Sequence, residues 1–152
     1  MISTILIISI SGALLVYWFR YACLLILSAK TTTDYAAGIA MANELDCLEV
    51  SHRLRANQPI ANLDELSQRL HRDYQVVTYL LANAARFDET GVSGTSVGME
   101  NSMLRMNYKL VRMAYKVMAP FAPRQARRAV DEMAQIVCHF ANVMGELAST
   151  GA

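Results

Sequence analysis

The sequence predicts an all-α protein, in which a single N-terminal transmembrane helix is followed by a four-helix bundle of two antiparallel hairpins. Three observations predict this class. The first 29 residues carry one charged side chain, Arg20, in an otherwise apolar run. Proline is scarce, with 3 residues in 152, and apolar side chains further along recur at helical spacing without strand-type alternation. We therefore expect an anchor with an apolar helical extension over residues 1–29 and a soluble bundle over residues 30–152.

The position of Arg20 decides where the predicted span ends. Residues 2–19 contain no charged side chain, and a helix of this length covers about 27 Å, close to the thickness of the hydrocarbon core. Aromatic rings surround the arginine as they do in interfacial belts with a snorkelling cation. We expect five residues at the membrane interface: Tyr17, Trp18, Phe19, Arg20 and Tyr21. The alternative is a span over residues 7–27 with Arg20 paired inside the membrane.

The flanking charges predict the orientation of the anchor. No Lys or Arg precedes the apolar run and no A-x-A cleavage site follows it, so we expect an uncleaved anchor rather than a signal peptide. The nearby basic residues all lie at or beyond the end of the span: Arg20, Lys30, Arg53 and Arg55. Positive-inside bias then favours an external N-terminus and a cytoplasmic bundle, as in a bacterial inner-membrane protein.

An apolar extension follows Arg20. If Arg20 lies at the headgroups, residues 22–27 leave the bilayer as helix that is apolar on every side, and water is a poor environment for such a surface. Either the bundle or another subunit is expected to cover it. The candidate partner-docking residues are Cys23, Leu24, Leu25, Ile26 and Leu27.

Four helices are expected in the bundle, at about 34–56, 63–87, 102–118 and 123–148. Asn57-Gln-Pro59 ends the first, and Asn62-Leu-Asp-Glu65 resembles a capping box that starts the second. A Gly-, Ser- and Thr-rich stretch over 88–101 is expected to be a long loop. Pro123 suits the first turn of the last helix. The short connections predict two antiparallel hairpins, whose apolar stripes pack together as a bundle.

A basic face of one sign is predicted on the third bundle helix and the start of the fourth. Between residues 102 and 128 there is no acidic residue, and spacings of 4, 3 and 4 place the first four cations on one side of the helix. The members of this basic face are Arg105, Lys109, Arg112, Lys116, Arg124, Arg127 and Arg128. A solvated face, anionic lipid headgroups or an acidic partner surface would each account for it. Nucleic acid is disfavoured by the net charge of +1 and by the lack of a recognition motif.

No constellation for catalysis stands out. Glu49 and His52 have the E-x-x-H spacing of carboxylate-bridged metal bundles, but those sites need two such motifs and two further Glu residues. Arg53 lies four residues after Glu49, which favours a surface ion pair. The three cysteines have no C-x-x-C spacing and are interpreted as small buried hydrophobes. We expect no enzyme activity, no cofactor, no bound metal and no small-molecule substrate.

These features predict a non-catalytic accessory or scaffold subunit of a larger membrane complex, of the kind found in respiratory or photosynthetic assemblies. It would dock through its apolar helix and its basic face to other subunits of the complex. One alternative is a membrane-anchored signalling or adaptor module that binds a soluble partner or anionic lipid. Another is a metal-binding bundle built around Glu49 and His52.

Overall fold

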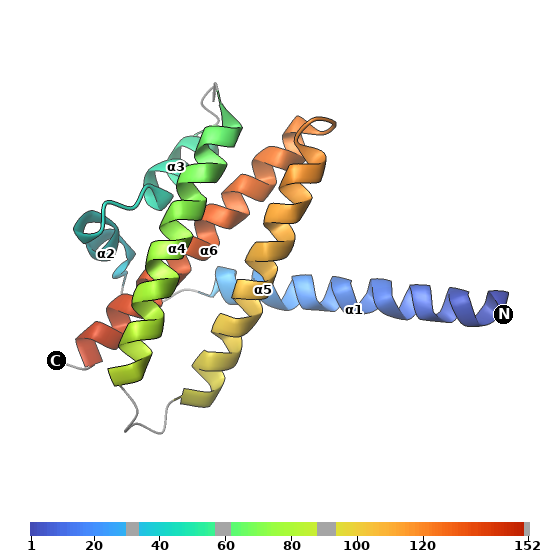
Figure 1. The fold of residues 1–152 in the computed structure, drawn as a ribbon, viewed down its shortest axis with the longest axis horizontal. Coiled ribbons are helices and arrows are strands. Elements are labelled where there is room, and N and C mark those ends of the chain that lie inside the picture. Colours follow the sequence, from blue (N-terminus) through green and yellow to red (C-terminus); the bar gives the residue numbers. More distant parts are fainter. Residues whose placement is uncertain (30–33, 57–61, 88–93, 151–152) are drawn as a thin grey trace. The chain divides into compact units, whose positions relative to one another are not determined.

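The structure is a computed structural model that describes residues 1–29, 34–56, 62–87 and 94–150 (Figure 1). Every regular element in these ranges is an α-helix, which confirms the all-α class. The helices are α1 (Ile2–Ser28), α2 (Ala36–Ala42), α3 (Cys47–Arg55), α4 (Leu63–Phe87), α5 (Gly94–Met118) and α6 (Pro123–Thr150). The chain divides into two compact units, Met1–Lys30 and Thr31–Ala152.

The first unit is the long apolar helix that the sequence predicts. Four consecutive apolar side chains, at residues 5–8, advance by about 100° each and so cover the whole circumference of α1. A helix that is apolar on every side belongs in a protein core or a membrane rather than in water. By length and composition, α1 can cross a membrane.

In the second unit, α6 is the central helix. Four helices pack against it: α2, α3, α4 and α5. In Figure 1, α6 is the orange-to-red ribbon. The apolar side chains of α6 recur every three or four residues, which places them on the faces that these neighbours cover. The buried members are Ala126, Val130, Met133, Ala134, Ile136, Val137, Phe140 and Ala141.

The connections explain part of this arrangement. A tight turn joins α5 to α6, because the Phe121 and Ala122 N–H groups both donate to the Met118 carbonyl and Pro123 opens α6. The expected arrangement of two antiparallel hairpins is not confirmed. α3 and α4 touch each other little, and each packs mainly against α6.

The expected helix over 34–56 is wrong, because the structure has two helices there. α2 ends at Ala42, and the backbone then turns through Glu44 at a φ of 52°. The Leu45 N–H donates to the Ala40 carbonyl at 2.9 Å, which is the closing hydrogen bond of a Schellman motif. This turn lets buried Leu45 and Cys47 reach the core from a new direction.

Two more boundaries differ from expectation. α5 begins at Gly94 instead of residue 102, and α6 continues to Thr150 instead of residue 148. The glycines and short polar residues at the start of α5 favour a loop by intrinsic propensity, which is why the sequence predicts one. Of the expected loop over 88–101, residues 88–93 lie outside the described residues.

Side chains from distant helices cap both short helices. α3 has no side-chain cap of its own, and instead the Asp46 N–H donates to Asp73 Oδ2 of α4 at 2.7 Å. At the start of α2, the Tyr35 N–H donates to Asn142 Oδ1 of α6 at 2.7 Å. Asp73 is 1 % exposed, and this burial raises its pKa although the Asp46 N–H stabilises the charged form. These contacts hold the break between α2 and α3 in place.

We expect Glu44→Gly to stabilise the protein. Glu44 adopts a left-handed backbone conformation in which a Cβ is strained, so glycine should raise the free energy of unfolding by about 1 kcal/mol. Denaturant unfolding of the full chain in non-ionic detergent would measure the change. Glu44→Ala is the control, because it removes the charge and keeps the Cβ. An equal gain from both variants would contradict the backbone explanation.

Candidate membrane anchor and cationic surface

The aromatic residues near Arg20 form one cluster on α1. The rings of Tyr17 and Tyr21 are stacked with centroids 6.5 Å apart, and Trp18 meets them edge-on at 6.3 and 6.0 Å. The two contacts of Tyr21, with Tyr17 and with Trp18, arise because residues three and four apart are neighbours on a helix. Rings with a polar edge and an apolar body suit the boundary between hydrocarbon and water. Phe19 and Arg20 lie in the same turn of α1.

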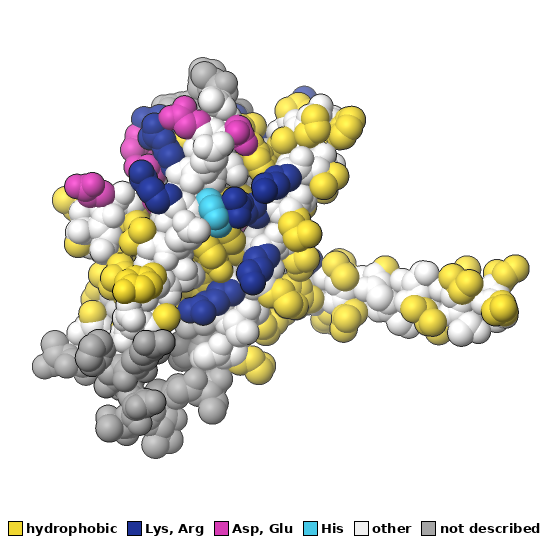
Figure 2. All heavy atoms as spheres, viewed as in Figure 1, with side chains coloured by type: hydrophobic (Ala, Val, Ile, Leu, Met, Phe, Trp, Pro, Cys, Tyr) yellow, Lys and Arg dark blue, Asp and Glu magenta, His cyan; other side chains and the backbone are white. Residues whose placement is uncertain are grey.

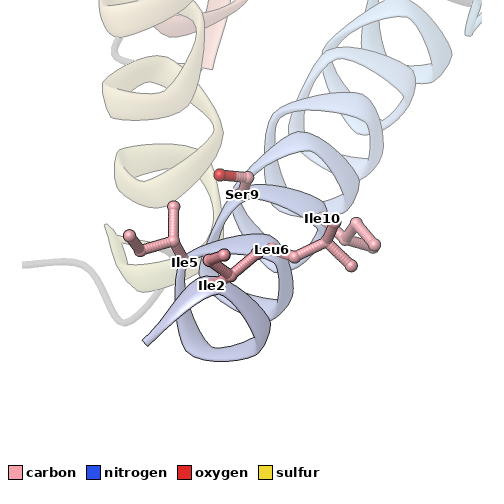
Figure 3. A pocket seen from close by; sticks show the side chains of 5 residues that line it. All are labelled: Ile2, Ile5, Leu6, Ser9 and Ile10. Carbon is pink, nitrogen blue, oxygen red and sulfur yellow. The ribbon is translucent and has the colours of Figure 1, made fainter.

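The N-terminal end of α1 carries a shallow apolar groove (Figure 3). Its lining consists of Ile2, Ile5, Leu6, Ser9 and Ile10, all from this one helix. Spacings of three and four residues place these side chains next to one another along the helix. A groove of this kind suits an acyl chain or the ridge of another apolar helix rather than an enclosed substrate.

The candidate docking residues Cys23 to Leu27 continue α1 without a break. The helix ends at Ser28, whose hydroxyl donates to the Leu25 carbonyl at 2.9 Å, and the Ala29 N–H donates to the same carbonyl at 3.0 Å. The apolar extension beyond Arg20 is therefore helical, as expected.

On α5, four members of the predicted basic face lie in a row. Arg105, Lys109, Arg112 and Lys116 follow one side of the helix, and Figure 2 shows Lys and Arg side chains over α5 with a histidine beside them. Arg112 and Lys116 both act on His71 of α4. Burial first, and then these two positive charges, lower the pKa of His71. The row on α5 therefore borders α4.

The four cations of the α5 row differ in their ion pairing from the arginines of α3 and α4. Three arginines there are paired with acids: Arg53 with Glu49, Arg69 with Glu65 at 2.7 Å, and Arg72 with Asp46 at 3.5 Å. In the described part of the chain, the four cations of the α5 row form no ion pair. No carboxylate of the described residues therefore lies within ion-pairing distance of these four cations.

The other three members of the predicted basic face lie on α6. Arg127 donates to the Leu54 carbonyl at the end of α3, at 3.1 Å, and so ties α3 to α6. Arg124 and Arg128 are exposed in the first turns of α6. The structure thus gives Arg127 a packing contact that the α5 row does not share.

Aromatic rings fill the space between α4 and α5. Tyr74 of α4 and Tyr108 of α5 are stacked with centroids 3.8 Å apart and planes 1° apart. His71 lies nearly parallel to Tyr108 at 6.2 Å, and Phe140 of α6 meets Tyr74 at 6.1 Å. Stacked pairs at this separation stabilise a contact by about 0.5–1.5 kcal/mol beyond the area they bury. The sequence shows Tyr108 beside the basic row but does not show that α4 would meet it.

Glu49 and His52 lie at the surface of α3. Both side chains are exposed, and Glu49 forms the ion pair with Arg53 that its spacing favours. Within the described ranges, no three or more His, Cys, Asp or Glu side chains are grouped so that they could hold a metal ion.

A pair of cysteines is the feature that the sequence interpretation missed. Cys47 at the start of α3 and Cys138 on α6 are 91 residues apart, yet the Cys138 thiol donates to Cys47 Sγ at 2.9 Å. Both are free, and their hydrogen bond, together with burial, raises the pKa of the Cys138 thiol. No local spacing in the sequence could indicate this pairing, because it depends on how α3 docks on α6.

We expect a mild thiol oxidant to join these two cysteines within one chain. With diamide, both thiol hydrogens pass to the azo group and one S–S bond forms. The product should be a cross-linked monomer that migrates faster in a non-reducing denaturing gel and returns to its original position after reduction. Cys47→Ser should abolish the shift, and Cys23→Ser should not. A shift that persists in Cys47→Ser would contradict the pairing.

The described residues thus combine an apolar helix, an aromatic cluster around an arginine, and a row of cations that form no ion pair among these residues. The first two suit a bilayer and its interface, and the third suits an anion. No protein-family model matches the chain, and no curated protein or solved structure is significantly similar to it.

Proposed function

We propose that this protein is a non-catalytic, single-span accessory or scaffold subunit of a larger membrane complex. The observation that carries the proposal is α1, which extends over 27 residues with apolar side chains on every side. The unit over Thr31–Ala152 buries a core of its own around α6. A helix of this kind anchors the chain in a bilayer, and the bundle supplies binding surfaces.

The anchor ends at the aromatic cluster in this proposal. Arg20 reaches the headgroups, Tyr17, Trp18 and Tyr21 lie at the same depth, and the bundle lies on the cytoplasmic side, where the basic residues after the span are favoured. Residues 22–27 then stand outside the hydrocarbon as apolar helix. A neighbouring subunit covers them, because an all-apolar helix is poorly soluble in water.

A second candidate function is a membrane-anchored adaptor. It is favoured by one observation, the row of unpaired cations on α5, since a charged surface without compensating acids suits transient electrostatic association. The two candidates differ in the lifetime of the complex. A subunit stays bound during purification, and an adaptor dissociates.

The test is recovery of the tagged full chain from its native membrane in mild detergent, followed by native electrophoresis and mass spectrometry. We expect the chain in one band far above its own 16.9 kDa, with the same partners in fixed ratio. Leu24→Arg combined with Leu25→Arg should break this association, whereas Arg53→Gln, a charge change on an ion-paired surface residue, should not. Recovery of the chain alone would exclude the subunit and favour the adaptor. A stoichiometric iron or manganese signal would overturn the non-catalytic assignment.

A further inference from the structure

Two buried polar atoms without a hydrogen-bond partner among the described residues lie where α4 meets α5. They are His71 Nδ1 and Tyr108 Oη, on side chains whose ring centroids are 6.2 Å apart. Tyr108 is 1 % exposed, so water has little access to its hydroxyl. A buried polar atom without a partner destabilises a fold by about 1–3 kcal/mol. Two of them on side chains that contact each other indicate a place where a ligand supplies the missing partners.

The charges around these atoms are nearly all positive. The positive charge of Arg112 acts to lower the pKa of both Tyr108 and His71, and the positive charge of Lys116 acts to lower the pKa of His71. Among the described residues, the carboxylate that acts on Tyr108 is Asp73, which accepts the Asp46 N–H at 2.7 Å and lies 3.8 Å from Arg72. The Asp73 carboxylate is thus already engaged by the Asp46 N–H at the start of α3 and by Arg72. The ligand that compensates this surface is an anion.

We propose that His71, Tyr108 and Arg112 form a binding site for a phosphoryl group. Lys116 lies about one turn after Arg112 on the same side of α5, and its positive charge, like that of Arg112, affects His71. The stacked rings of Tyr74 and Tyr108 close the side of the site next to the core. This inference does not depend on the proposed membrane function, because every residue in it belongs to the second unit.

The donor set favours a phosphoryl group over other anions. The Tyr108 hydroxyl and a protonated His71 Nδ1 are donors that require acceptors. A phosphate monoester offers three acceptor oxygens and close to two negative charges, whereas a carboxylate offers two oxygens and one charge. Arginine pairs with phosphate through two parallel hydrogen bonds, which suits Arg112.

The pKa of His71 reports whether an anion occupies the proposed site. The groups that face it are Arg112 and Lys116 of α5, with the Tyr74 and Tyr108 rings nearby. Burial and the two cations lower the pKa of His71 in the free protein, and a bound dianion opposes both cations, so it raises that pKa. The chain has three histidines, so substitution of each one assigns its NMR signal.

The first experiment titrates the full chain in non-ionic detergent with inorganic phosphate and follows the histidine NMR signals. We expect saturable shifts of His71 and a rise in its pKa of about one unit, with the exposed His52 unchanged. The second places the chain in nanodiscs of phosphatidylcholine with or without phosphatidic acid. A response to free phosphate assigns the site to a soluble phosphorylated ligand, and a response to phosphatidic acid alone assigns it to a lipid headgroup. Both outcomes support the site.

Variants separate this site from general surface charge. Tyr108→Phe and Arg112→Gln should each raise the Kd by about ten-fold, since each deletes one strong hydrogen bond. Arg53→Gln, which makes the same charge change on α3, should leave the Kd unchanged. Tyr108→Phe should also leave the ligand-free stability intact, because the hydroxyl that it removes has no partner. No His71 response in either arm, or equal weakening by Arg53→Gln, would overturn the proposal.

Discussion

A chain that lacks residues 1–30 should leave the membrane fraction completely and fold as a soluble helical domain. Between residues 2 and 19, α1 carries ten Ile, Leu, Val or Phe side chains, and each contributes roughly 0.3–0.6 kcal/mol to insertion. The sum is several kcal/mol, enough to shift the partition from almost wholly bound to almost wholly soluble. The remaining unit over Thr31–Ala152 keeps its central helix and all four packing partners of that helix.

Alkaline extraction of membranes, followed by circular dichroism of the soluble fraction, measures both parts of this result. Two point variants place the end of the span. Leu14→Arg puts a charge inside the predicted span, which costs about 2.5–3.5 kcal/mol of insertion free energy, while Leu24→Arg puts it beyond Arg20 and should leave membrane retention unchanged. An equal loss of membrane retention in Leu14→Arg and Leu24→Arg would place the span at residues 7–27 instead. A truncated chain that stays in the pellet as aggregate would contradict the division into anchor and bundle.

Gly145→Ala should destabilise the docking of α2 on α6. A Cβ on Gly145 would lie 2.2 Å from Tyr35 Cβ and 2.9 Å from Tyr35 Cγ. Tyr35 Cβ is fixed to the backbone that Asn142 holds by a hydrogen bond at 2.7 Å, so it cannot rotate away. Overpacking of this kind costs about 3 kcal/mol, and the better helix propensity of alanine returns about 1 kcal/mol. We expect a net loss of about 2 kcal/mol.

Hydrogen exchange of the α2 amides in the full chain, together with denaturant unfolding, would show this loss. Gly38→Ala is a matched control, because nothing lies within 4 Å of the Cβ it adds and α2 should gain about 1 kcal/mol. Tyr35→Gly removes the clashing atoms, so the double variant with Gly145→Ala should be less destabilised than the sum of the two single variants. Additive losses, or faster exchange in Gly38→Ala, would show that the close approach is not the cause.

The helices with strong periodicity were predictable from sequence. α4 has the expected bounds and α6 the expected start, because long amphipathic stripes, an acidic first turn in α4 and Pro123 in α6 all favour the same boundaries. The break between α2 and α3 was not predictable. It depends on Asp73 and Asn142, which reach the two helix starts from elements 27 and 107 residues away.

The candidate site likewise has one part that the sequence predicts and another that only the tertiary structure shows. The cation row on α5 follows from spacing alone, since Arg105, Lys109, Arg112 and Lys116 fall on one side of any helix. Two further features depend on how both helices lie on α6: α4 presents His71 and Tyr74 to this row, and the Tyr108 hydroxyl is buried without a hydrogen-bond partner among the described residues. The contact between Cys47 and Cys138 has the same origin.

The sequence by itself determined the helical class, the apolar helix able to cross a membrane, and the sign of the charge on α5. These properties depend on side-chain chemistry and on the 3.6-residue period, which act over a few turns. Only the tertiary structure decided which helix is central, where the first bundle helix divides, and which polar atoms are left without partners. Those outcomes require burial, and burial depends on residues that are distant in the chain and meet only when the helices pack.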